Sequence, residues 1–276
     1  MIKLYWRLFR KFTTFYFRAM TIYDVHSPFV AGLAKMVLED RRRFYAYSLA
    51  NRIRDILAHN QSTIKVQDFG AGSLVEANTE RTISSIAKNS AIPPRAGRWL
   101  FKLVRYLQSQ RVLELGTSLG ISTVYLSFAN LFGKIITIEG DPSLAWMAKE
   151  NFKRIALKNV TSMQGRFTEK LPLALTQLEK LDLLFMDGDH RKSPTLQYFE
   201  QCLPFVHNNT AIVVADNHWS DEMESAWATM KDHPQVRISV DLFHFGILFF
   251  RKEPKEKEHY CLVPARWKPW RLGFFK

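Results

Sequence analysis

Four short stretches of the sequence end in glycines or carboxylates directly after an apolar run. They are VLELGTSLG (112–120), ITIEGD (136–141), LFMDGDH (184–190) and VVADN (213–217). An open α/β sheet gathers its ligands at the carboxyl ends of its strands. The four stretches are therefore predicted to meet in one active site.

The first two stretches have the features of a cofactor loop. Gly116 and Gly120 flank a three-residue turn after an apolar strand, and residues without Cβ atoms let backbone amides approach a ligand closely where a helix begins. The spacing is G-x-x-x-G rather than G-x-G-x-x-G, and Glu114 precedes the loop, which favours S-adenosylmethionine over NAD. Glu139 ends the next strand, where its carboxylate can accept both ribose hydroxyls.

The other two stretches have the features of a metal site. LDLLFMD (181–187) and AIVVADN (211–217) are apolar runs that end in acids, so Asp187, Asp216 and Asn217 should meet at the edge of adjacent strands. Two carboxylates and an amide oxygen suit a hard divalent cation, with water and substrate oxygens completing an octahedral shell. We therefore predict Mg²⁺ or another divalent cation beside the cofactor.

Alternating strands and helices must position these residues. Helices are expected at 97–108, 121–131, 142–154, 170–179 and 194–203, between strands at 111–115, 134–139, 159–164, 181–186 and 210–215. This alternation indicates a parallel sheet covered on both faces. Two further runs, 236–242 and 247–251, predict an antiparallel hairpin at the end of the sheet.

From about residue 92 to 251, this arrangement resembles the class I methyltransferases, and the four motifs resemble those of metal-dependent O-methyltransferases similar to catechol and caffeoyl-CoA O-methyltransferases. The resemblance implies a Rossmann-like α/β fold with a mostly parallel seven-stranded sheet and a C-terminal antiparallel hairpin, together with S-adenosylmethionine as cofactor. It implies that Asp187, Asp216 and Asn217 hold the metal. The predicted cofactor contacts are Glu114, Gly116, Thr117, Ser118, Gly120, Ser122, Glu139, Gly140, Arg166, Phe167 and Asp187, with Gly165 near the adenine.

One position departs from that family. A Lys lies three residues after the first metal-binding Asp in those enzymes, and this chain has His190 there. An imidazole can also act as a general base near neutrality, and Asp189 either orients it or is itself the base. In the expected reaction, the metal lowers the pKa of an acceptor hydroxyl, His190 takes the proton, and the oxyanion attacks the sulfonium methyl. Because DGDH also occurs in methyltransferases of sugars and other natural products, the acceptor is left as a small-molecule, glycan or lipid-like hydroxyl.

The two ends of the chain carry most of its net charge of +13. Residues 1–20 hold five basic and no acidic residues, and residues 251–276 hold eight Lys or Arg against three Glu. In a helix over 1–20, the basic residues share one narrow face and aromatic residues cover the rest. Two interpretations fit: an interfacial membrane helix, or a helix packed on its own catalytic domain or on a second subunit with the basic face in solvent.

Four regions follow from these patterns. Residues 1–60 form a helical extension, with a break at His26 and one helical stretch over 29–59. We also consider His26 as a substrate contact. Residues 61–94 form a connecting or cap segment. Residues 95–251 form the methyltransferase domain, and 252–276 form a basic aromatic tail. IKVQDFGAGS (64–73) imitates a nucleotide-binding turn, but no strand ending in an acid follows it. We interpret it as a loop or cap near the pocket mouth, with substrate contact through Asp68 as the alternative.

The remaining expectations concern location and partners. Two cysteines without metal-ligand spacing predict a cytoplasmic protein. No apolar run reaches about 18–20 residues, so we expect no membrane span and no cleaved signal. The basic ends suggest peripheral contact with the inner membrane surface. A homodimer is a further expectation. The alternatives are an RNA methyltransferase, suggested by RWKPWRLGFFK (266–276), and a non-catalytic membrane-associated binding protein.

Overall fold

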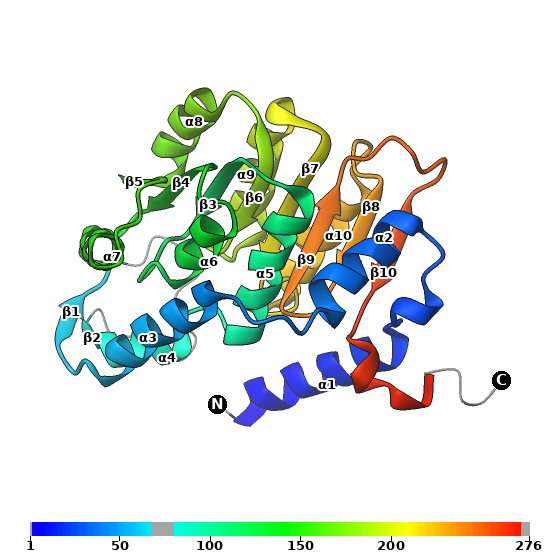
Figure 1. Cartoon of the computed structure of the whole chain (residues 1–276), viewed down its shortest axis with the longest axis horizontal. Coiled ribbons are helices and arrows are strands. Elements are labelled where there is room, and N and C mark those ends of the chain that lie inside the picture. The colour runs from blue at the N-terminus through cyan, green and yellow to red at the C-terminus, as the bar shows by residue number, and fades with distance from the viewer. Residues whose placement is uncertain (1, 68–79, 272–276) are drawn as a thin grey trace.

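A mixed β-sheet forms the centre of the molecule in a computed structural model, which describes residues 2–67 and 80–271 (Figure 1). Within these residues the sheet has eight strands in the order β10-β8-β9-β7-β6-β3-β4-β5. Only β9 among them runs antiparallel to its neighbours. The strands are β3 (Arg111–Leu115), β4 (Lys134–Glu139), β5 (Val160–Gln164), β6 (Leu181–Met186), β7 (Val206–Ala215), β8 (Ile238–Asp241), β9 (Phe245–Phe249) and β10 (Glu258–Cys261).

The predicted Rossmann-like architecture with its antiparallel hairpin is confirmed, but the expected count of seven strands was wrong. The additional strand β10 pairs in parallel with β8 at the edge of the sheet. Its sequence, EHYC, lacks the apolar run that identified the other strands, because an edge strand has fewer buried side chains.

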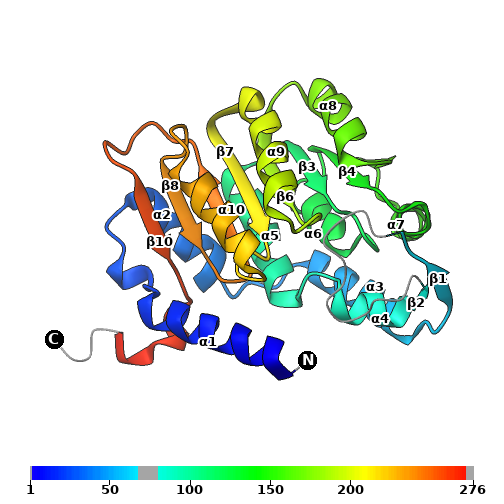
Figure 2. The same ribbon diagram turned by 180° about the vertical axis from the view of Figure 1, so that it is seen from behind.

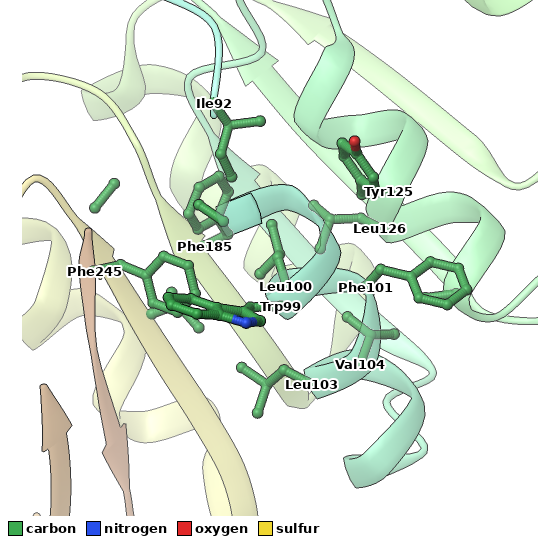
Figure 3. Packing of buried hydrophobic residues seen from close by; sticks show 14 of the residues in the cluster. Ile92, Trp99, Leu100, Phe101, Leu103, Val104, Tyr125, Leu126, Phe185 and Phe245 are labelled. Carbon is green, nitrogen blue, oxygen red and sulfur yellow. The ribbon is translucent and has the colours of Figure 1, made fainter. Parts of the chain in front are cut away.

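Helices cover both faces of the sheet, because successive strand residues point in opposite directions. Leu183 and Phe185 of β6 belong to one buried cluster, and Leu184 and Met186 belong to the other. Trp99 belongs to the same cluster as Leu183 and Phe185, and Figure 3 shows it close to Phe245 of β9. The covering helices are α5 (Pro94–Leu107), α6 (Ile121–Ala129), α7 (Pro142–Arg154), α8 (Phe167–Leu178), α9 (Lys192–Cys202) and α10 (Asp221–Asp232).

The helix α10 was not predicted, although its start has a recognisable signal. The Ser220 hydroxyl accepts a hydrogen bond from the amide of Met223 at 3.1 Å, and acidic residues fill the first turn. Both features stabilise the N-terminus of a helix. No helix was expected between the strand at 210–215 and the hairpin that begins at residue 236.

The N-terminal region adds several helices and two short strands to the sheet and its covering helices. They are α1 (Ile2–Arg18), α2 (Pro28–Leu33), a π-helix (Ala34–Glu39), α3 (Tyr45–His59), β1 (Thr63–Lys65), β2 (Glu80–Thr82) and α4 (Ile83–Asn89). The single helical stretch expected over 29–59 is interrupted at 40–44. There the Asp40 carboxylate accepts hydrogen bonds from the Arg42 backbone and side chain, which holds the chain in a turn.

The helix α1 packs on its own catalytic domain beside the C-terminal segment, as Figures 1 and 2 show. The ring of Phe12 meets Phe243 at a centroid distance of 5.0 Å, and Met20 pairs with Leu262. The expectation that the basic face of a packed helix would lie in solvent was wrong in part. Lys11 instead binds Asp221 of α10 at 3.0 Å, and Arg7 donates to the backbone carbonyl of Trp219 at 3.0 Å. None of the described helices is both long and apolar enough to cross a bilayer.

Candidate active site

A cavity of about 830 Å³ lies at the carboxyl ends of β3, β4, β6 and β7. Strands β4 and β6 lie on opposite sides of β3, so the chain changes direction there, where open α/β sheets bind ligands. Residues from all four motifs line the cavity, and residues 88–93 of the N-terminal region form part of its wall.

Glu139 and the loop after β3 form one side of the cavity. The carboxylate of Glu139 accepts hydrogen bonds from the backbone amides of Ser118 at 2.7 Å and Asp141 at 3.0 Å. Burial raises the pKa of Glu139, and these two amides act in the opposite direction. Its carboxylate is thus fixed at the end of β4, where it lines the cavity.

Gly116 joins this side of the cavity to the acidic side. Its φ of +98° lies in the region that favours glycine, and a Cβ there would overlap the carbonyl oxygen of Asp187 and lie 2.8 Å from its carbonyl carbon. The backbones of these two loops are therefore in direct contact. A side chain at position 116 would push them apart.

A buried polar network lies beneath the cofactor loop. The Glu114 carboxylate accepts hydrogen bonds from Thr123 at 2.5 Å and Thr137 at 2.6 Å, and Thr137 in turn contacts the hydroxyl of Thr117 at 2.5 Å. Burial raises the pKa of Glu114 to about 7. The network links β3, β4 and α6, and so it supports the loop from below.

Two aromatic residues line the cavity at the end beside the loop after β6. Phe167 and Tyr198 line it and meet edge to face at 5.5 Å, while Gly188 leaves room for the Phe167 ring. Arg166 lies on the same wall. This end offers an aromatic face and polar groups, a combination that suits a flat heterocycle such as adenine.

The acidic side of the cavity brings together Asp187, His190 and Asp216. The Nε2 atom of His190 lies 3.9 Å from a carboxylate oxygen of each aspartate, and ligand atoms of all three residues lie within 4.8 Å of one another. Burial raises the pKa of Asp187 well above its usual range, and the negative charges of Asp216 and Glu114 act in the same direction. Two carboxylates held this close favour a cation between them.

Asn217 is fully buried behind this cluster. Its Nδ2 donates to Asp241 at 3.2 Å, but its Oδ1 has no hydrogen-bond partner among the described residues. A buried carbonyl oxygen without a partner costs roughly 1–3 kcal/mol. Such an acceptor is therefore available to a ligand that the protein binds. A metal ion is one such ligand.

The carboxylate of Asp189 forms its hydrogen bonds with Arg191 and Tyr198. Its carboxylate binds the side chain of Arg191 at 2.6 and 3.0 Å and accepts a hydrogen bond from Tyr198 at 3.2 Å. No hydrogen bond joins Asp189 to His190 in the part of the chain that is described. The Asp189 carboxylate is thus engaged by Arg191 and Tyr198, and its role as the base or as the residue that orients His190 stays a prediction.

Three non-glycine residues of the cavity lining have a left-handed backbone. Ser118, Asp189 and Asp216 have φ values of 48°, 51° and 52°, and all three line the cavity. Residues other than glycine rarely adopt this conformation, and such strain often marks functional sites. The strained backbone lies in three of the four motifs that the sequence singled out.

Some predicted site residues lie behind the cavity wall. Among the described residues that line it are Gly116, Ser118, Glu139, Gly140, Arg166, Phe167, Asp187, Asp189, His190 and Asp216. The lining does not include Glu114, Thr117, Gly120, Ser122, Gly165, Asn217 or His26. Glu114 and Thr117 belong instead to the polar network beneath the cofactor loop, and Asn217 lies buried behind the acidic cluster. Asp68 and the rest of the DFGAGS stretch (68–73) lie outside the described residues, although Val66 and Gln67 beside it line the cavity.

The structure adds lining residues that the sequence did not suggest. Asp141 caps α7 by accepting a hydrogen bond from Leu144 at 2.7 Å and also accepts one from the amide of Gln67 at 2.6 Å. An Asp before Pro142 is a helix-start signal that could have identified it. Trp219 and His244 also line the cavity. Burial lowers the pKa of His244, and nothing in the sequence around it marks it.

Fold and site together define a class I S-adenosylmethionine-dependent methyltransferase. A family model described as a methyltransferase domain matches residues 113–217, which contain all four motifs except the first residue of one. The chain belongs to the O-methyltransferases: it is 30% identical over 169 residues to a protein named as an O-methyltransferase from Mycobacterium sp. strain JLS, covering 59% of this chain and 71% of that protein.

Two further similarities agree with this family. The chain is 32% identical over 130 residues to a catechol O-methyltransferase of Niastella koreensis, a match that covers 46% of this chain and 58% of the relative. This chain thus spans less than two thirds of that relative. The fold matches that of a Bacillus cereus O-methyltransferase in complex with SAH, with a TM-score of 0.54, 18% identity, and coverage of 77% of this chain and 93% of the other.

Proposed function

We propose that the protein transfers a methyl group from S-adenosylmethionine to a hydroxyl of a small-molecule, glycan or lipid-like acceptor, with the help of a divalent cation such as Mg²⁺. The observation that carries this proposal is the division of the cavity. Glu139 and the glycine loop lie on one side, and Asp187, His190 and Asp216 lie on the other.

The first side suits S-adenosylmethionine, which supplies an electrophilic methyl group on its sulfonium. The carboxylate of Glu139 is held by two backbone amides, so it is oriented before any ligand arrives. Phe167 and Arg166 offer an aromatic face and a cation to the adenine end. The bound SAH in the Bacillus cereus enzyme of the same fold is consistent with this assignment.

The second side suits a hard cation, which when bound would lower the pKa of the acceptor hydroxyl. Asp187, Asp216 and Asn217 would hold it, and the free Oδ1 of Asn217 supports this choice. Asp216 is held in place through its backbone, because its amide donates to His244 and its carbonyl accepts from Trp219. The carboxylate of Asp216 lines the cavity 3.9 Å from the Nε2 atom of His190, where a ligand can reach it.

His190 is the proposed general base. Its side chain is one quarter exposed and lines the cavity, so it can reach a hydroxyl bound there. Its Nε2 also lies close enough to both aspartates to be a metal ligand instead. The two roles differ in a measurable way, since a base affects turnover whereas a ligand also affects cation affinity.

The experiment that tests the proposal measures transfer of labelled methyl from S-adenosylmethionine to phenols, glycans and lipid extracts. Addition of Mg²⁺ should support transfer and a chelator should abolish it. D216N should lower transfer by at least about 100-fold, whereas D55N, which changes an exposed carboxylate on α3, should have no effect. H190A should lower turnover without changing cation affinity. Full transfer by D216N in the presence of a chelator would reject the metal role.

A further inference from the structure

The outward side of α1 carries aromatic and basic residues that the packing of the helix does not use. Trp6, Phe9 and Phe17 have exposed fractions of 62%, 59% and 71%, and Arg10 and Arg18 are also exposed. With 3.6 residues per turn, positions 6, 9, 10 and 17 share one side of a helix, and position 18, in the last turn, lies roughly 80° around the helix from position 10. We call these five residues the outer face of α1.

The opposite side of the helix is firmly attached to the catalytic domain. Phe15 is buried and lies 5.4 Å from the ring of Phe243, and Lys11 binds both Asp221 and Glu224. The exposure of the outer face is therefore not caused by a loosely placed helix. The helix has two apolar sides, of which the residues described by the structure cover only one.

The C-terminal segment continues the same surface. Trp270 is 55% exposed, and its ring lies 6.3 Å from Tyr16, whose own ring lies 5.9 Å from that of Phe17. Arg271 next to it pairs with Asp24 at 3.0 Å. In Figures 1 and 2 this segment lies beside the end of α1 on the same side of the molecule.

We infer that the outer face of α1, together with Trp270, docks on an anionic lipid bilayer. Exposed Trp and Phe side chains favour the boundary between headgroups and acyl chains, and arginines on the same surface attract anionic headgroups. The helix from residue 2 to 18 contains no acidic residue, and Arg10 and Arg18 form no ion pair with another described residue. The charge of the face is therefore available to a negatively charged partner.

A second copy of this chain fits the surface less well. In a twofold dimer the same patch meets itself, so arginines would face arginines. No carboxylate on the outer face would compensate them. A bilayer supplies many negative charges together with an apolar layer, and so it satisfies both kinds of side chain.

The attachment of α1 also connects the docking surface to the cavity. Arg7, on the packed side of the helix, donates a hydrogen bond to the carbonyl oxygen of Trp219, which lines the cavity. The inference itself does not depend on the methyl transfer proposed above.

The test is sedimentation of the full chain with vesicles of phosphatidylcholine alone or mixed with phosphatidylglycerol. Wild-type protein should bind the anionic vesicles and bind the neutral ones weakly. R10Q/R18Q should weaken binding to anionic vesicles about 25-fold, since each arginine near an anionic surface contributes about fivefold. W6A/F9A/F17A should weaken binding by at least about tenfold because it removes the apolar contact.

The matched control is F132A/W146A, which removes two aromatic side chains that are 99% and 64% exposed elsewhere on the molecule. It should bind vesicles like the wild type, and thermal unfolding should show that every variant is folded. The inference is overturned if wild-type protein ignores anionic vesicles, or if the outer-face variants bind as well as the control. It is also overturned if the protein binds RNA or forms a dimer through this face and does not bind vesicles. Because no cofactor or acceptor is present, these outcomes are independent of methyl transfer.

Discussion

Gly116 is the position where one methyl group should disturb both halves of the cavity. An alanine there must keep a φ of about +98°, which costs roughly 1–2 kcal/mol for a residue with a Cβ. The same Cβ overlaps the carbonyl oxygen of Asp187, and overpacking of this kind costs about 1–3 kcal/mol. G116A should therefore lower the free energy of unfolding by about 2–5 kcal/mol, and the Tm by about 4–10 °C.

The effect on activity should exceed the effect on stability. Relief of the overlap requires the loop after β3 or the loop after β6 to move, and a misplacement of about 1 Å can lower a rate by about 100-fold. G116A should therefore reduce methyl transfer by about this factor even at temperatures where the variant is folded. Thermal unfolding followed by circular dichroism and transfer of labelled methyl measure the two effects separately.

G133A is the matched control for this substitution. Gly133 lies in a turn remote from the cavity and does not have a left-handed φ; a Cβ there would lie 3.0 Å from the carbonyl oxygen of Gln110. It should cost less than G116A and leave transfer per folded molecule unchanged. If G116A and G133A have the same Tm and the same activity, the close contact between the two loops does not affect stability or methyl transfer, and the prediction is refuted.

Two further predictions concern buried groups. Burial raises the pKa of Glu114 from its ordinary 4.5 to about 7, so its contribution to stability is full below pH 4.5 and is lost as pH rises through 7. The free energy of unfolding of wild type minus that of E114Q should thus fall by up to about 3 kcal/mol from pH 4.5 to 8 in urea titrations, and a pH-independent difference would reject the shift. F15A, at a side chain that is 5% exposed, should cost about 3–5 kcal/mol and speed tryptic cleavage of α1, whereas F9A should change the free energy of unfolding by less than about 0.5 kcal/mol. Equal effects of F15A and F9A would mean that α1 does not pack as described.

The sequence predicted the central fold well because its strands are short apolar runs with clear ends. The expected strands 111–115, 134–139 and 181–186 and the helix 142–154 agree with β3, β4, β6 and α7 to the residue. Strand β10 was missed because an edge strand needs little apolar surface. The packing of α1 could not be chosen from its pattern, since the same amphipathic helix suits a membrane or a protein surface.

Site residues at the ends of strands could be predicted from the order of the strands along the chain. The hydrogen-bond partners of individual side chains could not. The motif positions of Glu139, Asp187 and Asp216 placed all three on one cavity. No spacing rule indicated that Asp189 would bind Arg191 and Tyr198 in place of His190. Nor could a spacing rule show that Glu114 points into a buried threonine network, because that network depends on Thr123 of α6 and Thr137 of the neighbouring strand β4.

The division of the cavity into a cofactor side and a metal side is tested most directly by calorimetric titration with S-adenosylhomocysteine. Wild type and D216N should bind it with the same affinity, because Asp216 lies on the acidic side. E139A should bind at least about tenfold more weakly, because it removes the carboxylate held by the amides of Ser118 and Asp141. Equal affinity of E139A and wild type, or no saturable binding by wild type, would contradict the account.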